Sequence, residues 1–378
     1  MKVLQKRFLL VAGYPDSLLN FRGPFLRALL AEGLDVHVAA PDLPEDSPIR
    51  HKLENLGVQV HEVILKRTGV NPLIDLITMV QLWWLMRSIK PDFTLGYTIK
   101  PVIYGSLAAW FAAVPHRYAM ITGLGYAFQG ENGDRLWLKR IVASLYSAAL
   151  ANTHKVFFQN PDDEALFYQQ NILRQIEQKS VVVNGSGIDV DSFKLVTLPE
   201  KPCFLLIARL IGDKGVREYV KSASIVKNSH PEASFGLVGW IDDNPDSISE
   251  NELAEWIDFG VIEFYGRLAD VKPAIANCSV YVLPSYREGT PRTVLEAMAM
   301  GRPIITTDAP GCRETVTDGD NGYLVPVKSV EDLALAMQKF IKNPDLIKAM
   351  GKQSRQIAEE KYDVNKVNQQ MLHEMGVI

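Results

Sequence analysis

Short hydrophobic runs alternate along the first half of the chain with longer stretches of helical periodicity. The runs predict strands at residues 7–12, 35–39, 58–63, 92–95, 117–121, 155–158 and 179–183. The stretches between them predict helices at residues 21–32, 73–89, 102–113, 135–151 and 161–170. Strands that alternate with helices are typical of a parallel sheet covered by helices on both faces.

A polar segment at residues 184–193, NGSGIDVDSF, interrupts the alternation, which then restarts. Further strands are predicted at residues 203–208, 234–238, 261–264, 281–284 and 303–307. Further helices are predicted at residues 216–227, 250–258, 271–276, 293–300, 330–342, 345–361 and 364–375. The length of 378 residues allows two domains. We therefore predict an α/β protein with domains at residues 1–186 and 187–362, and a last helix within residues 363–378.

The stretch from Tyr281 to Asp308 adds chemistry to its strand–helix–strand pattern. Pro291 suits a first helical position, which leaves the N–H groups of Gly289 and Thr290 beside a positive helix end. Such an end suits an anion, for example a diphosphate. Glu296 follows about one turn later, where a carboxylate can accept hydrogen bonds from sugar hydroxyls. Two isolated glutamates such as Glu288 and Glu296 are more often a solvated loop residue and a helix partner.

Two cations follow the predicted strand at residues 203–208, which ends in LLIAR. Arg209 and Lys214 are expected at the carboxyl edge of the sheet, where open α/β sheets bind ligands. Arginine holds phosphate oxygens bidentately and lysine acts as a point charge. Two Asp-x-Asp pairs, Asp189/Asp191 and Asp318/Asp320, lie in the linker and in a Gly/Asn-rich turn, where turn chemistry accounts for them. We therefore expect fixed cations rather than a metal.

Composition and charge narrow the class of protein. A net charge of −4, from 40 basic and 44 acidic residues, gives no indication of nucleic-acid binding. Residues 1–187 hold 19 Lys/Arg and 16 Asp/Glu, against 21 and 28 in the remainder. The mild basicity suits an anionic membrane surface, and ordinary scatter of charge accounts for it equally well.

The cysteines and apolar stretches indicate a cytosolic protein. Three cysteines without C-x-x-C spacing fit a reducing compartment. The short apolar run near the start predicts a strand rather than a signal peptide. The longest uncharged stretch, Pro101–Pro115, is shorter than the ~20 residues that span a bilayer. We expect a soluble or peripheral protein.

These features together resemble the retaining glycosyltransferases of family 4, which have the GT-B fold of two facing Rossmann-like domains. The resemblance rests on Glu288 and Glu296, on the segments GTPRTVLEAMA and GRPIITTDAPGCRETVTDGDNGYLV, and on the Arg…Lys-Gly pattern at Arg209 and Lys214. It implies that Arg209 and Lys214 bind the donor diphosphate and that Glu288 approaches the donor sugar. The other implied donor-binding residues are Glu296 at the ribose, Gly289, Thr290 and Pro291 through their main chain, and Arg267 and Leu268 under the nucleobase.

Segments of the first half, NFRGPF, YTIKP, TGLGYAF and FFQNPDD, resemble a narrower group that builds capsule and O-antigen repeats on polyprenyl diphosphate. The implied acceptor- or sugar-binding residues are Asn20, Arg22, Lys100, Thr122, Gly123 and Tyr126. Asn20 is expected to cap a helix that has Arg22 just inside it. Thr122 stands where the family often has a histidine, and we expect its hydroxyl and the Gly123 backbone to contact the sugar instead.

Aromatic and basic residues are crowded into three predicted helices of the first half. They are Trp83, Trp84, Trp110, Phe111 and Trp137, with Lys100, Arg135, Lys139 and Arg140 among them. Apolar rings beside cations suit an interface with anionic lipid and a diphosphate head group. Packing of the same rings in the core is the alternative for most of them.

The resemblance implies transfer, with retention and without metal or cofactor, from a nucleoside diphosphate sugar. We expect a UDP-linked hexose or N-acetylhexosamine as donor and a polyprenyl-diphosphate-linked saccharide as acceptor, in O-antigen or capsule assembly. The expected location is peripheral, at the cytoplasmic face of the plasma membrane. Two alternatives stay open, a nucleotide-sugar 2-epimerase on the same fold and a non-catalytic subunit that binds sugar nucleotides.

Overall fold

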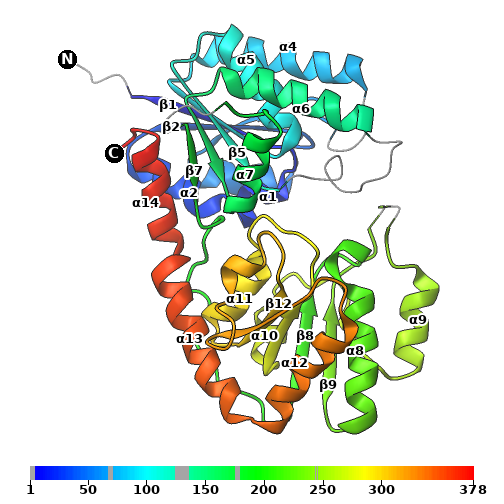
Figure 1. Ribbon diagram of the computed structural model, residues 1–378. Helices are drawn as coiled ribbons and strands as arrows, with labels where there is room; N and C mark the ends of the chain where they lie inside the picture. Colours follow the sequence, from blue (N-terminus) through cyan, green and yellow to red (C-terminus); the bar gives the residue numbers. More distant parts are fainter. Residues whose placement is uncertain (1–4, 67–70, 124–135, 175–178, 243, 245) are drawn as a thin grey trace. The chain divides into compact units, whose positions relative to one another are not determined.

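The computed structural model describes residues 5–66, 71–123, 136–174, 179–242, 244 and 246–378 (Figure 1). The chain forms two compact units. Unit 1 comprises residues 1–186 and 367–378, and unit 2 comprises residues 187–366. The C-terminal end of the chain therefore belongs to the same unit as the N-terminal half.

Unit 1 contains a parallel sheet with the strand order β3-β2-β1-β4-β5-β6-β7. The strands are β1 (Arg7–Val11), β2 (Asp35–Ala40), β3 (Gln59–Glu62), β4 (Phe93–Tyr97), β5 (His116–Ile121), β6 (Lys155–Phe158) and β7 (Ser180–Val182). The helices are α1 (Asp16–Asn20), α2 (Gly23–Ala31), α3 (Pro48–Asn55), α4 (Pro72–Ile89), α5 (Ser106–Phe111), α6 (Leu136–Ala151), α7 (Pro161–Gln169) and α14 (Val364–Glu374). The strand order reverses between β1 and β4, which is the switch point of a doubly wound sheet.

Unit 2 repeats this order with β10-β9-β8-β11-β12-β13, again all parallel. The strands are β8 (Cys203–Ile207), β9 (Ser234–Val238), β10 (Glu263–Phe264), β11 (Val280–Leu283), β12 (Ile304–Thr307) and β13 (Gly322–Val325). The helices are α8 (Val216–Ser229), α9 (Glu250–Asp258), α10 (Lys272–Ala276), α11 (Arg292–Ala299), α12 (Val330–Lys342) and α13 (Asp345–Lys361). Its switch point lies between β8 and β11.

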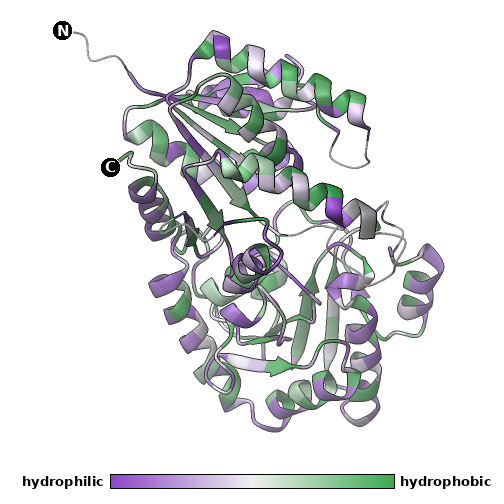
Figure 2. Cartoon of the chain, turned by 45° about the horizontal axis from the view of Figure 1, so that its top comes forward, coloured by the Kyte–Doolittle hydropathy of each residue, from purple (hydrophilic) through white to green (hydrophobic). Residues whose placement is uncertain are grey.

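Strand β1 shows why the central strands are hydrophobic throughout. Phe8 and Leu10 pack in a core with helix α2, while Leu9 and Val11 pack in a second core with α4 and α5. Successive side chains of a strand point to opposite faces, so helices on both faces require an apolar residue at every position. Hydrophobic residues, green in Figure 2, accordingly predominate in the central strands of both sheets.

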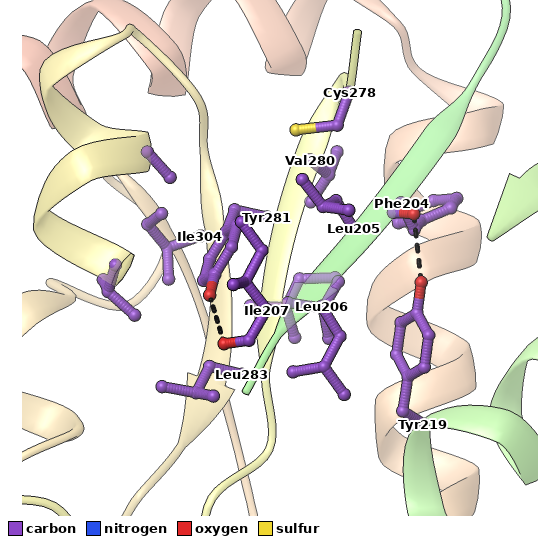
Figure 3. Close-up of a cluster of buried hydrophobic side chains, with 14 of the residues drawn as sticks. Phe204, Leu205, Leu206, Ile207, Tyr219, Cys278, Val280, Tyr281, Leu283 and Ile304 are labelled. Carbon is purple, nitrogen blue, oxygen red and sulfur yellow. Dashed lines mark hydrogen bonds between the residues drawn. The ribbon is translucent and has the colours of Figure 1, made fainter. Parts of the chain in front are cut away.

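The core of unit 2 includes two tyrosines whose hydroxyls bond to strand carbonyls (Figure 3). Tyr281 on β11 donates to the Ile207 carbonyl at 3.1 Å, and Tyr219 on α8 donates to the Phe204 carbonyl at 3.0 Å. Burial raises the pKa of both phenols well above its usual value, which keeps them neutral donors. Both bonds tie neighbouring elements to the central strand β8.

Helix α2 confirms the helix expected over residues 21–32, but α1, which lies in the preceding expected loop, and α3 were not predicted. Two further local predictions differ from the structure. The helix expected over residues 102–113 opens with a π-helical turn at Pro101–Gly105 before α5 begins. Pro291 is the residue before α11 rather than its first residue, with an extended backbone (φ −73°, ψ 106°).

Helix α14 returns the chain to unit 1. Its residues Met371 and Leu372 lie in the core beside β1 and α2, and Met375 follows them. The Tyr118 hydroxyl on β5 donates to the Met375 carbonyl at 2.5 Å, and Lys155 pairs with Glu374. Across the described residues, the model contains no helix that is both long and apolar enough to cross a membrane.

Candidate active site

Two loops leave the carboxyl edge of the unit 2 sheet on either side of its switch point. One follows β8 and carries Arg209 and Lys214; the other follows β11 and carries Glu288. Because β8 and β11 are hydrogen-bonded neighbours, their loops begin side by side. The sequence pattern placed the three residues at this edge, and the structure has them there.

The two loops meet at an ion pair between Lys214 and Glu288. The Lys214 Nζ lies 2.5 Å from the Glu288 Oε1, and both side chains are only 16% exposed. Lys214 ends a 3₁₀ turn at Gly212–Lys214, and the Glu288 backbone N–H donates to the Pro310 carbonyl at 2.9 Å. A largely buried lysine therefore pairs with a carboxylate at the place where a diphosphate was expected.

Two glycines allow the loops to approach this closely. Gly215 has φ +66°, and a Cβ there would lie 2.1 Å from the carbonyl oxygen of Pro284. Gly311 has φ +80°, and a Cβ there would lie 2.2 Å from the carbonyl oxygen of Glu288. Both positions need glycine for its backbone conformation and for its lack of a side chain. Gly215 directly follows Lys214, and Gly311 lies against the backbone of Glu288, so both glycines help to position the pair.

Hydrogen bonds add to this fixation. The backbone N–H of Tyr286 donates to the Asp213 carbonyl at 2.8 Å, and the Ser285 hydroxyl donates to the same oxygen at 3.1 Å. Thr307, at the end of β12, donates its hydroxyl to the Ser285 carbonyl. The loop after β11 is thus bound on one side to the loop after β8 and on the other to β12.

Arg209 has a partner that the sequence did not reveal. Its Nη1 donates to the Asp242 Oδ2 at 2.7 Å, and both side chains are partly exposed. Asp242 follows β9, the other neighbour of β8. The guanidinium of Arg209 is therefore oriented from a third loop of the same edge.

Glu296 lies on α11 and is almost fully buried. Burial raises the pKa of its carboxyl above the usual value, although Arg292, one turn earlier, opposes the shift through a bond of 2.9 Å. Glu296 therefore has an i,i+4 partner, Arg292, as expected for a glutamate with a purely structural role. The expected contact with a ribose stays a prediction.

Arg267 and Leu268 follow β10 at the same edge. The Arg267 guanidinium lies 4.7 Å from the ring centroid of Trp240, and Leu268 packs partly against the core. Trp240, just after β9, is a further residue that sequence reasoning missed. A lone tryptophan in a polar loop gave no signal in the sequence.

In unit 1 the structure changes the interpretation of the NFRGPF segment. Asn20 is the exposed last residue of α1 and does not cap α2. Arg22 precedes α2 instead of lying inside it, and its side chain is buried. Its Nη2 lies 2.7 Å from the Met120 sulfur, and its guanidinium lies 5.1 Å from the Tyr97 ring centroid. Arg22 thus joins α2 to β4 and β5.

Lys100 follows β4 and pairs with a buried aspartate. Its Nζ lies 2.7 Å from the Asp75 Oδ1, and the Tyr104 hydroxyl donates to the Asp75 Oδ2 at 2.9 Å. Thr122 and Gly123 directly follow β5 and are partly buried. Tyr126 lies outside the described residues. The unit 1 residues that are described therefore follow or adjoin the carboxyl ends of β1, β4 and β5.

The aromatic residues expected at a membrane divide into two groups. Trp84, Trp110 and Phe111 are exposed, whereas Trp83 is partly buried. Lys139 is partly buried and Arg140 is exposed. Arg135 and the side chain of Trp137 lie outside the described part of the chain.

The first aspartate of each Asp-x-Asp pair accepts hydrogen bonds from nearby backbone N–H groups. Asp189 Oδ1 accepts from the backbone N–H groups of Asp191 and Ser192, and Asp318 Oδ1 accepts from that of Leu324 at 2.9 Å. Within the residues that the structure describes, no three His, Cys, Asp or Glu side chains form a group suited to a metal ion.

Known proteins resemble the chain over nearly its whole length. Residues 188–357 match the model of glycosyl transferases group 1, and residues 14–160 match that of glycosyl transferase 4-like proteins. The N,N′-diacetylbacillosaminyl-diphospho-undecaprenol α-1,3-N-acetylgalactosaminyltransferase of Campylobacter jejuni is 30% identical, with 94% of each chain covered. This chain belongs to the family 4 glycosyltransferases. The family that the sequence motifs predicted is therefore confirmed.

Other relatives of this glycosyltransferase agree. The UDP-Gal:α-D-GlcNAc-diphosphoundecaprenol α-1,3-galactosyltransferase of Escherichia coli is 21% identical, covering 82% of this chain and 81% of that protein. The structure of Anabaena HepE in complex with UDP superposes with a TM-score of 0.76 at 18% identity, covering 98% and 100%. Sucrose-phosphate synthase from Thermosynechococcus elongatus gives 0.78 at 17% identity, covering 98% of each. These likenesses confirm the GT-B fold class of this glycosyltransferase.

Proposed function

We propose that this glycosyltransferase moves a hexose or an N-acetylhexosamine from a UDP-sugar to a saccharide linked to polyprenyl diphosphate. The transfer retains the anomeric configuration and uses no metal, at the cytoplasmic face of the membrane. The observation that carries the proposal is the Lys214–Glu288 pair at the switch point of unit 2, with Arg209 beside it on the same loop. The names of the Campylobacter and Escherichia relatives, both with diphospho-undecaprenol acceptors, support the acceptor class.

The cations supply what departure of a diphosphate requires. Arg209 and Lys214 stand on a loop whose partners hold them in place before a substrate arrives, so their charges need little reorganisation when negative charge develops on the leaving group. In this proposal the donor diphosphate replaces Glu288 as the ionic partner of Lys214. Glu288 then accepts hydrogen bonds from the donor sugar.

Retention follows from a same-face exchange. The bond from the anomeric carbon to the donor phosphate oxygen breaks, and the acceptor hydroxyl oxygen bonds to the same face of that carbon. The electron pair of the broken bond stays on the departing phosphate oxygen, and the acceptor proton passes to this oxygen, so that UDP leaves protonated and the charge balances. The protein's part is to bind the diphosphate and to orient the sugar.

A donor and acceptor panel tests the proposal. UDP-, GDP- and TDP-sugars are offered with EDTA and a short-chain polyprenyl-diphosphate saccharide, and the anomeric configuration of the product is read by NMR. We expect an α-linked product from one α-configured UDP-sugar. Product that appears only after metal is added, or inverted product, contradicts the proposal. Release of an epimer without acceptor would indicate the 2-epimerase instead.

A further inference from the structure

The first three turns of α4 expose an apolar face to solvent. Its members are Leu73, Leu76, Ile77, Val80 and Trp84, with exposed fractions of 73%, 52%, 50%, 42% and 63%. Their spacing of three or four residues puts them on one side of the helix, over a length of about 16 Å. We call this set the α4 face. Exposed apolar residues are ordinary when scattered, but a continuous row is typical of an interaction surface.

The opposite side of α4 is apolar as well. Leu82, Met86 and Ile89 are buried in the core that α4 shares with β1 and α5. A helix that is hydrophobic all round is normally covered on all sides, so the α4 face needs a partner. The helix is also held firmly: Asn71 caps it, and the Thr78 hydroxyl donates to the Ile64 carbonyl at 2.6 Å.

The charge around the α4 face identifies the partner. Between Glu62 and Gly130 the sequence has six Lys or Arg residues and three acidic residues, Glu62, Asp75 and Asp92. Glu62 is exposed and lines a hollow with Arg50 and Trp84, and its Oε1 accepts from the backbone N–H of Leu43 at 3.2 Å. Asp75 is held by Lys100 and Tyr104, and Asp92 accepts from the backbone N–H of Arg7 at 2.8 Å. Arg87 and Lys90, at the end of α4, and Lys66 before it are exposed. An apolar row flanked by exposed basic side chains suits the surface of an anionic lipid bilayer. The same positive charges disfavour contact with the α4 face of a second copy of the protein.

The neighbouring helix also exposes aromatic residues. Helix α5 lies beside α4 (Figure 1), and its last residues, Trp110 and Phe111, are 45% and 58% exposed. Aromatic rings of this kind favour the head-group region of a bilayer. We propose that unit 1 docks on an anionic phospholipid bilayer through the α4 face, with α4 lying in the plane of the membrane surface.

The same helix connects the docking surface to the expected acceptor site, a step that rests on the proposed function. Asp75, on the inner side of α4, holds Lys100 and Tyr104, which follow the carboxyl end of β4. That end lies at the switch point of unit 1. Docking therefore fixes the height of this edge above the bilayer, where the diphosphate of a membrane-anchored acceptor emerges.

Vesicle sedimentation tests the inference with matched variants. The full-length protein, Leu76→Glu, Val80→Glu and the control Leu335→Glu are mixed with vesicles of phosphatidylethanolamine and about one quarter phosphatidylglycerol. Leu335 on α12 of unit 2 is 56% exposed, close to the 52% of Leu76. We expect about tenfold weaker binding for each α4 variant, because each removes apolar contact and adds a charge that anionic lipid repels. The control should bind as the unaltered protein does, and vesicles of phosphatidylcholine alone should bind it less.

Three results overturn the inference. They are no vesicle binding by the unaltered protein, equal loss in the control and the α4 variants, and a dimer that Leu76→Glu dissociates while vesicles bind nothing. Transfer to a water-soluble short-chain acceptor is measured in parallel for every variant. It needs no bilayer, so retained transfer without vesicle binding rejects the docking surface and leaves the proposed function intact. Circular dichroism of each variant checks its folding.

Discussion

Lys214 and Glu288 stand 74 residues apart in sequence and meet in one ion pair. Glu288→Gln keeps the size of the side chain but removes the charge and weakens hydrogen bonds to a sugar. We expect turnover to fall by a factor of about 100 to 1000, in the range for loss of one preorganised electrostatic contact. Steady-state rates at saturating donor measure the effect.

The control for this variant is Glu331→Gln, an exposed glutamate in the first turn of α12. We expect it to leave turnover unchanged. Denaturant unfolding of Glu331→Gln should match that of the unaltered protein, whereas Glu288→Gln should be less stable but still folded under assay conditions, because the largely buried Lys214 loses its charged partner. Near-normal turnover of Glu288→Gln would remove Glu288 from the proposed mechanism.

At the residue scale, part of the candidate site was predictable from the sequence. Residue types and loop positions predicted Arg209, Lys214 and Glu288 at one edge, because strands of a parallel sheet end together. The pairs Arg209–Asp242, Trp240–Arg267 and Lys100–Asp75 were not predictable, since each joins elements that only the folded sheet brings together. Arg292–Glu296 was accessible from its i,i+4 spacing alone.

At the scale of the elements, Gly215 holds the loop after β8 against the loop after β11. An alanine Cβ would lie 2.1 Å from the Pro284 carbonyl oxygen, so the backbone of one loop has to move. We expect Gly215→Ala to lower the free energy of unfolding by about 3 kcal/mol or more. Turnover should fall as well, because Lys214 is the adjacent residue. Denaturant unfolding and donor kinetics measure the two effects.

Gly260→Ala is the control that separates the two effects expected in Gly215→Ala, the backbone strain of a positive φ and the clash with the Pro284 carbonyl oxygen. Gly260 has φ +62°, near the +66° of Gly215, but a Cβ there would meet no atom within 4 Å. Its cost should therefore be the strain of a left-handed alanine alone, about 1 kcal/mol. Equal losses in the two variants would show that the contact with Pro284 adds nothing.

Glu252 makes the start of α9 sensitive to acid. Hydrogen bonds from Arg217 and from the Ser249 backbone lower the pKa of Glu252 to about 2. The charged form is thus favoured in the folded state, and this stabilisation is complete above the usual pKa of 4.5 and is lost as pH falls toward 2. Because the side chain is 35% exposed, water screens it, and we expect Glu252→Gln to cost only about 1 kcal/mol at pH 7.

Denaturant unfolding at pH 7 and at pH 4 measures this difference, which should narrow at the lower pH. Glu250→Gln, in the same first turn of α9, is the control and should change stability less. A gap between Glu252→Gln and the unaltered protein that widens with acid would contradict the assigned pKa.

Most strands were predictable because central parallel strands are apolar at every position. The missed helices are α1 and α3. Ser47 and Pro48 mark the start of α3, but this helix has no apolar stripe, because Leu53 is its one buried residue. Helix α1 has only five residues and no side-chain cap. The π-helical turn before α5 has no comparable sequence rule.

At the scale of the whole molecule, both sheets reverse their strand order at the third crossover, which is β3 to β4 in unit 1 and β10 to β11 in unit 2. The alternation of strands and helices predicted parallel sheets, but not which strands are neighbours, since every right-handed crossover has the same sequence pattern. Because of this shared order, the loops that carry the proposed site residues follow β8 and β11 in one unit and β1 and β4 in the other.

The C-terminal helix α14 completes the core of a unit whose other residues end at position 186. Met371 is fully buried there, so Met371→Ala leaves a cavity that should lower the stability of unit 1 by about 2–5 kcal/mol. Hydrogen exchange locates the loss: amides of β1 and β2 should exchange faster, and those of β8 and β11 should not change. The exposed neighbour Gln370→Ala should leave both sets unchanged. Equal acceleration in both sheets would mean that the two units unfold together, so that α14 stabilises the entire chain rather than the unit it packs in.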